Sequence, residues 1–112
     1  MFIFIECWKA RPEWLSLTHD ERSEYLNHLS SGINELAKTG AEIVTWSLND
    51  TDTPHRIDYD YFAIWRFPTK ELVVQFEQII EQSGWYNYFE QVNLRGKESD
   101  PPTIIKHTIH NI

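Results

Sequence analysis

The chain of 112 residues carries ten Lys and Arg against 17 Asp and Glu, which gives a formal net charge of −7 at pH 7. The basic residues are scattered and form no stripe that phosphates can follow, so nucleic acid is not expected as a partner. The length suits one domain whose core needs neither disulfides nor a structural metal, and the single cysteine, Cys7, has no partner for a bridge within the chain.

The first predicted element is a strand over residues 2–8. Its apolar run, Phe2 to Ile5, lacks a basic leader and is far shorter than a signal-peptide core or a membrane span. An unpaired cysteine in apolar surroundings also fits a reducing compartment. These observations predict a cytoplasmic protein that has no membrane partner.

A helix is predicted to begin near His19, because Thr18 and Glu21 have the Thr-x-x-Glu spacing of a capping box. Gly40 is well placed to end this helix in a left-handed turn. Four apolar residues fall three or four positions apart on one helix face: Leu26, Leu29, Ile33 and Leu36. The spacing predicts an amphipathic helix that packs on the core.

Two strands are predicted next, over residues 42–48 and 59–67, from the alternation of their side chains. The loop between them is long for a hairpin and rich in Asp and His, which makes it a candidate functional segment. Thr69 is a plausible N-cap for a second helix, which ends near Gly84, and a last strand covers residues 88–95.

The predicted order is strand, helix, strand, strand, helix, strand. This order is typical of an α+β, ferredoxin-like βαββαβ fold, with a four-stranded antiparallel sheet and both helices on one face. We expect one domain over residues 1–96, followed by a C-terminal linker and tail over 97–112. Ile105, Ile109 and Ile112 have helix-like spacing, so the tail is expected to dock, either on its own domain or on a partner.

Both faces of the predicted sheet are apolar. We assign the aliphatic face to the helices, and its residues are Ile3, Ile5, Cys7, Val44, Leu48, Phe62, Ile64, Val92 and Leu94. The other face is largely aromatic, with a few polar positions: Phe2, Phe4, Glu6, Trp8, Thr45, Ser47, Tyr61, Ala63, Trp65, Phe67, Gln91, Asn93 and Arg95. Because such an aromatic patch is too apolar to be left in water, we expect it to be covered in a homodimer built sheet to sheet.

The element order and the aromatic sheet face resemble the dimeric α+β barrel superfamily over residues 2–95. Its members include small cofactor-free monooxygenases, haem-degrading enzymes, sugar mutarotases and muconolactone isomerase-like proteins. The runs FIECWKARPEWL, WSLNDTDTPHRIDYDYFAIWRFP and SGWYNYFEQVNLRG resemble, more narrowly, an uncharacterised bacterial family of about this length. The haem-degrading members use a helix-borne His as axial ligand, and the predicted second helix, 70–83, has none, so no cofactor is expected.

Glu6 and Arg95 interrupt the aromatic face on strands expected to be neighbours, and Gln91 and Asn93 add hydrogen-bonding groups there. One interpretation is an ion pair that fixes the register of a dimer. The other is a ligand site, in which Glu6 is a desolvated general base. Seven aromatic side chains could form the walls of a site for a flat ligand, although core and interface packing explains them without one: Trp8, Trp46, Tyr61, Trp65, Trp85, Tyr86 and Tyr88.

The long loop holds a second candidate, His55, which Asp60 or Asp58 could orient as an acid/base pair; a solvated loop is the simpler interpretation. No metal is expected, because the calcium-loop pattern lacks its glycine and His107 and His110 lack a third ligand. Signatures of hydrolases, kinases and metalloproteases are absent.

Two functions follow from these patterns. The first is a homodimer that binds a small apolar or aromatic molecule in a sheet-lined cavity, and that acts as a cofactor-independent monooxygenase or isomerase if it is an enzyme. The second is a structural or interaction module, in which the aromatic sheet face only forms the dimer.

Overall fold

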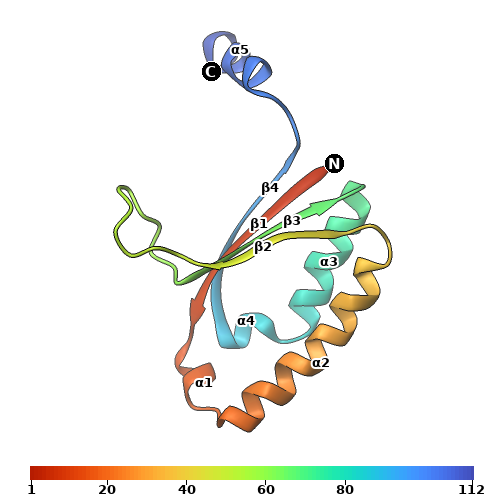
Figure 1. Ribbon diagram of the computed structural model, residues 1–112, viewed down its shortest axis with the longest axis vertical. Coiled ribbons are helices and arrows are strands. Elements are labelled where there is room, and N and C mark those ends of the chain that lie inside the picture. Colours follow the sequence, from red (N-terminus) through yellow and green to blue (C-terminus); the bar gives the residue numbers. More distant parts are fainter.

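The computed structural model describes residues 1–112. Its elements are β1 (Phe2–Ala10), α1 (Pro12–Leu15), α2 (His19–Ala37), β2 (Glu42–Leu48), β3 (Tyr61–Phe67), α3 (Lys70–Gln82), α4 (Trp85–Tyr88), β4 (Phe89–Lys97) and α5 (Pro101–His110). The four strands form one antiparallel sheet in the order β2-β3-β1-β4, and α2 and α3 cover one of its faces (Figure 1). This confirms the predicted ferredoxin-like α+β fold. No helix combines the length and the apolar character that crossing a membrane requires.

The two long helices begin where the sequence predicts. The Thr18 side chain accepts a hydrogen bond from the Glu21 N–H, and the Glu21 carboxylate accepts one from the Thr18 N–H, so the capping box is complete. Thr69 caps α3 by accepting from the Leu72 N–H. Gly84, at φ 83°, turns the chain from α3 into the short helix α4, which has too few residues for its periodicity to be seen in the sequence.

The predicted assignment of the sheet faces is wrong, because α2 and α3 cover the aromatic face. Trp65, Phe4, Phe67, Phe76 and Val73 are the largest fully buried side chains, and Phe76 and Val73 belong to α3. The Phe76 ring packs against those of Phe4, Trp65 and Phe67, at centroid distances of 5.8, 4.7 and 5.4 Å. The aromatic side chains that the sequence pattern places between two subunits therefore form the core of one subunit.

The aliphatic face of the sheet carries no helix. Strand pairing aligns Ile5 with Ile64 and Leu94, and Cys7 with Phe62 and Val92, so these side chains share this uncovered face. Leu94 is 67% exposed and Val92 40%, while Cys7 is half-buried. On β2 the register places Thr45 and Ser47 on this face, opposite Ile64 and Phe62, and puts Leu48 with the aromatic residues on the helix side, so the predicted grouping of these β2 side chains is wrong. We call this surface the open face, defined by Ile3, Ile5, Cys7, Thr45, Ser47, Phe62, Ile64, Val92 and Leu94.

The tail forms a helix as its spacing indicates, but it does not lie on its own domain. β4 stays paired with β1 up to its last residue, Lys97, and the chain then leaves the sheet and leads into α5, which stands apart from the other helices (Figure 1). Every residue of α5 is exposed.

Candidate functional site

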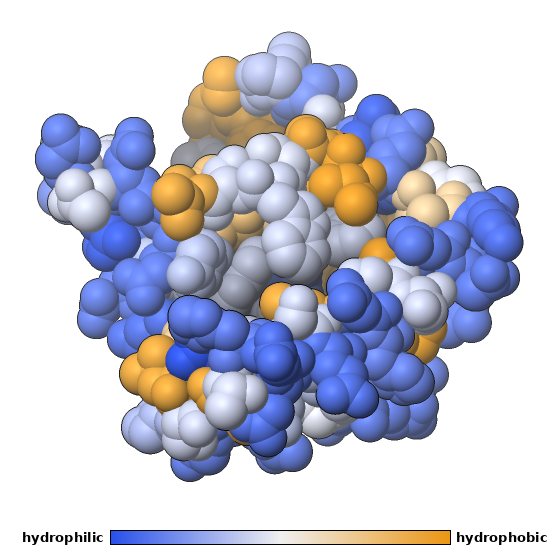
Figure 2. Space-filling view, turned by 60° about the horizontal axis from the view of Figure 1, so that its bottom comes forward, coloured by the Kyte–Doolittle hydropathy of each residue, from blue (hydrophilic) through white to orange (hydrophobic).

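An aromatic pocket of about 240 Å³ lies between the sheet and the helices α1, α2 and α4. All eight of its lining residues are hydrophobic: Trp8, Ala10, Trp14, Leu26, Trp46, Tyr61, Trp85 and Phe89. Seven elements contribute to the lining, so the pocket exists only in the folded chain. Figure 2 shows the end of the molecule that Figure 1 draws at the bottom, where pale side chains gather in a hollow bordered by hydrophilic ones.

Trp8 lies at the centre of the pocket wall. Its ring stacks on Tyr61 at a centroid distance of 5.6 Å, and it meets the rings of Trp46 and Trp85 edge to face at 5.1 and 5.8 Å. The hairpin strands β2 and β3 supply Trp46 and Tyr61, while α4 supplies Trp85. This packing fixes several flat, apolar surfaces around one space, which is the chemistry that recognises planar apolar molecules.

Two contacts hold α1 and α4 together at the mouth of the pocket. The Arg11 N–H donates to the Tyr88 carbonyl at 2.8 Å, and its Nε donates to the Tyr86 carbonyl at 3.1 Å. The Trp14 ring then packs on Phe89 at a centroid distance of 4.7 Å. The short helices thereby become part of the pocket wall.

Glu6 is the only charged side chain in the buried core and is 4% exposed. The Trp65 indole donates to its Oε2 at 2.9 Å, and the Gln91 Nε2 donates to its Oε1 at 3.1 Å. The Gln91 Oε1 in turn accepts from the Trp85 indole at 2.7 Å. Because Trp85 lines the pocket, a chain of hydrogen bonds runs from the pocket wall to Glu6, although Glu6 does not itself line the pocket.

Burial raises the pKa of Glu6 to about 7, and the hydrogen bonds from Trp65 and Gln91 offset only part of the cost of removing the carboxylate from water. No cation lies beside this carboxylate to neutralise it. A carboxyl group that titrates near neutral pH can take up or release a proton under physiological conditions, which an exposed glutamate cannot do.

The predicted pairing of Glu6 with Arg95 is wrong. Arg95 donates instead to both carboxylate oxygens of Glu77 on α3, at 2.7 and 3.0 Å. In the strand register Arg95 lies opposite Phe4, and Asn93 lies opposite Glu6. Asn93 does join the network, since its Oδ1 accepts from the Gln91 Nε2 at 2.8 Å.

The other candidate residues fall into two groups: Trp8, Tyr61 and Trp65 lie at or next to the pocket, and His55 and Asp60 lie outside it. Trp8 and Tyr61 line the pocket, while Trp65 lies beneath it in the core as a donor to Glu6. His55 and Asp60 belong to neither place. The His55 side chain is exposed and has no hydrogen bond or ion pair, so it does not form the predicted acid/base pair with Asp60 or Asp58.

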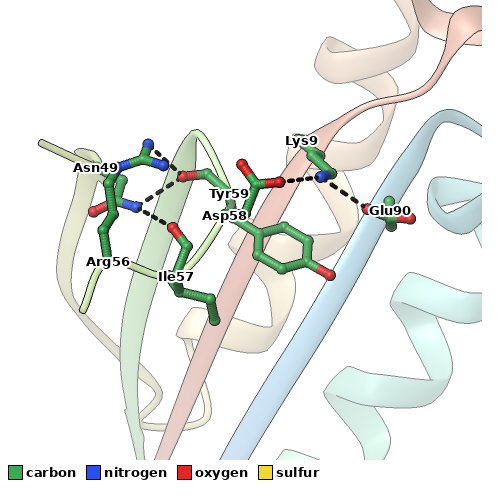
Figure 3. A network of polar contacts seen from close by, with 7 residues as sticks. All are labelled: Lys9, Asn49, Arg56, Ile57, Asp58, Tyr59 and Glu90. Atoms are coloured by element: carbon green, nitrogen blue, oxygen red, sulfur yellow. Dashed lines mark hydrogen bonds and ion pairs between the residues drawn. The ribbon is translucent and has the colours of Figure 1, made fainter. Parts of the chain in front are cut away.

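The loop that carries His55 is held by its own polar contacts (Figure 3). The Asn49 amide donates to the carbonyls of Ile57 and Tyr59, at 3.1 and 2.8 Å. Lys9 bridges Asp58 and Glu90 at 3.3 Å each, which ties the loop to β1 and β4. His55 has a φ of 57°, in the left-handed region that non-glycine residues seldom occupy. The ion pair with Lys9 gives Asp58 a structural role.

Sequence reasoning missed four lining residues, Ala10, Trp14, Leu26 and Phe89. The helix periodicity places Leu26 on the core face only, and Trp14 depends on α1, which is too short for a periodic signal. Phe89 is the first residue of β4, and strand alternation, which puts it on the face of Gln91, could have identified it. None of the lining residues is a His, and α3 contains none either, so the pocket offers no imidazole as an axial ligand for haem.

The sequence model of one family, described as a family of unknown function (DUF6616), matches residues 1–111. The search of curated proteins found no match. Among solved structures, a mutant chlorite dismutase from Candidatus Nitrospira defluvii is similar with a TM-score of 0.69 and 11% identity, over 96% of this chain and 47% of that one. A protein of unknown function from Rhodopseudomonas palustris has a TM-score of 0.60 and 14% identity, over 89% of this chain and 83% of that one.

These similarities establish the fold alone, which is a ferredoxin-like α+β arrangement of one four-stranded antiparallel sheet and its helices. The chain spans about half of the length of the chlorite dismutase (47%). At 11% and 14% identity, the shared architecture says nothing of a shared reaction.

Proposed function

The chain belongs to DUF6616, a family of unknown function, and we propose that it is a homodimer that binds a small, planar, apolar molecule in its aromatic pocket. The single observation that carries the binding proposal is the pocket itself, whose eight lining residues are all hydrophobic and include four tryptophans. A wall of tryptophan rings binds ligands with a flat π-surface most tightly, because stacking adds to the free energy gained from the burial of apolar area.

The volume of the pocket indicates the size of the group that it can enclose. An apolar cavity of about 150 Å³ holds benzene, and pockets for drug-sized molecules begin at about 300 Å³. At about 240 Å³, the pocket is suited to one substituted ring or two fused rings. We therefore propose a naphthalene-sized compound, without a charged group inside the pocket, as the ligand class.

The homodimer proposal rests on the open face. Its side chains from β1, β3 and β4 are aliphatic, apart from Phe62 and Cys7, while β2 adds the polar Thr45 and Ser47, and no helix of the chain covers it. Contiguous apolar patches of this kind are uncommon on monomers and mark interaction sites. A two-fold axis that brings two open faces together would bury both at once, as isologous dimers do. The sheet-to-sheet dimer thus remains our proposal, but its interface is aliphatic where the sequence indicates an aromatic one.

Replacing Leu26 with tryptophan is expected to weaken binding of 2-naphthol at least about tenfold, a loss of about 1.4 kcal/mol. Leu26 lines the pocket from α2 and is 38% exposed, so the larger ring can fill the space without disturbing the core. Isothermal titration calorimetry gives the dissociation constant directly.

Leu15→Trp is the matched control, because Leu15 is 63% exposed and does not line the pocket. It is expected to bind 2-naphthol like the parent chain. Equal affinity of the Leu26→Trp variant would place the bound molecule elsewhere. No binding by the parent chain would favour the non-catalytic alternative, a module in which these aromatic residues only pack.

Proton transfer is the second candidate function, and the hydrogen-bonded path from Trp85 through Gln91 to Glu6 favours it. Cofactor-independent oxidation and isomerisation both begin with the removal of a proton from the substrate, and a carboxylate with a pKa of about 7 is a suitable base. Glu6 can reach a ligand only if Gln91 turns aside.

If Glu6 is the base, Glu6→Gln is expected to abolish turnover of hydroxylated naphthalenes while leaving their affinity within a factor of about three. Oxygen uptake and mass spectrometry of the products measure the turnover. Activity that survives in the Glu6→Gln variant would assign Glu6 to structure alone.

A further inference from the structure

The tail presents an apolar stripe that nothing in its own chain covers. Ile105 and Ile109 lie along one side of α5, with Ile104 beside them and Ile112 just past the end of the helix. Their exposed fractions are 58%, 67%, 55% and 92% in that order. Four large aliphatic side chains within nine residues are far more than the single exposed hydrophobics that are normal on a surface.

The route of the tail is fixed where it leaves the domain. The Arg66 guanidinium donates to both carboxylate oxygens of Glu98, at 2.7 and 3.2 Å, and the Glu98 N–H donates to the Met1 carbonyl at 2.9 Å. Asp100 then caps α5 by accepting from the Thr103 N–H, and prolines occupy the first two helical positions. The contacts of Glu98 fix the direction in which the tail leaves the domain, and the capped first turn of α5 continues from there. Together they hold the apolar stripe away from its own domain.

Charge favours an acidic partner for this helix. Residues 101–112 contain Lys106, two histidines and no acidic residue, whereas residues 1–100 hold nine Lys and Arg against all 17 Asp and Glu. A second copy of this chain supplies such an acidic surface.

The area of the open face gives an independent argument for a second copy. Four strands about 4.8 Å apart and about 25 Å long make a face of roughly 500 Å². A stable interface buries about 800 Å² on each partner. A helix of ten residues is about 15 Å long and 10 Å wide, so one tail given and one tail received add about 300 Å² to each protomer and bring the interface to the usual size.

We propose that α5 is an exchanged arm, which lays its isoleucine stripe on the partner protomer of the dimer. This proposal rests on the sheet-to-sheet dimer proposed above. It divides the chain into a globular domain, residues 1–96, and an intersubunit tail, residues 97–112. The tail and the open face then form one interface, because neither alone buries the area that a stable dimer needs.

The test compares dimer dissociation constants by sedimentation equilibrium for full-length variants. Ile109→Asp places a charge in the stripe and is expected to weaken the dimer at least about tenfold, since the burial of two isoleucines is lost in each dimer. Thr103→Asp introduces the same charge at a position off the stripe, near the favourable N-terminus of α5, and is expected to leave the constant within about twofold.

Hydrogen exchange of the α5 amides gives a second measurement that does not depend on affinity. The amides are expected to be protected in the parent dimer and to exchange freely in the Leu94→Asp variant, whose open face carries a charge. Equal protection in that monomeric variant would mean that the tail docks on its own domain. A dimer that forms equally well in the Ile109→Asp variant would overturn the tail proposal alone, whereas a parent chain that is monomeric at millimolar concentration would overturn the dimer and the tail together.

Discussion

Raising the pH from 4.5 to 7 is expected to cost the folded protein about 3 kcal/mol of stability through Glu6 alone. In the unfolded chain this carboxyl ionises near its ordinary pKa of 4.5, whereas in the folded protein it keeps its proton until about pH 7. Between these values the folded state binds more protons, so each added pH unit favours unfolding by up to about 1.4 kcal/mol. The contribution is complete below pH 4.5 and is lost above pH 7.

Glu6→Gln isolates this contribution, because its side chain cannot ionise. Trp65 and Gln91 both donate to Glu6, so the amide that replaces the carboxyl group leaves one donor without an acceptor, and the variant carries a constant cost of about 1–3 kcal/mol. The difference in unfolding free energy between the parent chain and the variant is therefore expected to shrink by about 3 kcal/mol from pH 4.5 to pH 8. Urea denaturation, followed by tryptophan fluorescence at several pH values, measures it.

Glu77→Gln is the control for this comparison. Glu77 lies on the helix side of the sheet, as Glu6 does, but its ion pair with Arg95 is about one third exposed. The effect of this variant on stability is expected to stay within about 1 kcal/mol. A Glu6→Gln variant whose pH dependence parallels that of the parent chain would show that Glu6 is ionised at pH 5, and would remove the basis for a proton-transfer role.

Leu94→Asp is expected to convert the dimer to a monomer, with a dissociation constant at least about 100-fold higher. Leu94 lies opposite Ile5 on the open face and is 67% exposed within one chain, so the substitution barely changes the stability of the protomer. In a two-fold dimer it brings two unpaired carboxylates into an aliphatic interface. Light scattering over a concentration series measures the change in mass.

Leu15→Asp introduces the same charge at an equally exposed leucine, on α1 and away from the open face. It is expected to dimerise like the parent chain. If both variants weaken the dimer to the same extent, the cause is general charge repulsion in an acidic protein, and the open face is not the interface.

The element order was predictable because local signals mark each boundary. Thr18, Glu21 and Thr69 cap their helices as the sequence indicates, and the strand from Glu42 to Leu48 has the predicted bounds. The sheet faces were not predictable from alternation, since both faces of β1 and β3 are apolar and a period of two does not say which face the helices cover. Aliphatic content favoured the other face for the helices, which left the aromatic face as the expected interface. In the fold the polar Gln91, Asn93 and Arg95 of the aromatic face contact Glu6, each other and α3.

The candidate site was predictable in part, for a related reason. Trp8 and Tyr61 were identifiable as ligand-holding residues because they lie on one face of paired strands. Trp14 enters the pocket through α1, a helix of four residues whose position depends on contacts such as that of Arg11 with Tyr88. Contacts between residues this far apart leave no mark in a local pattern. The pairing of Arg95 with Glu77 likewise depends on where α3 crosses the sheet.

The open face also carries a chemical reporter. Cys7 is the only thiol of the chain and lies there between Phe62 and Val92. Burial, with the nearby Glu6 carboxylate as a smaller cause, raises the pKa of the Cys7 thiol, so the reactive thiolate is scarce at neutral pH and alkylation is slow. Its rate should depend on protein concentration, because only protomers with an uncovered face can react. Labelling kinetics at one natural residue would thus measure how often the two subunits separate.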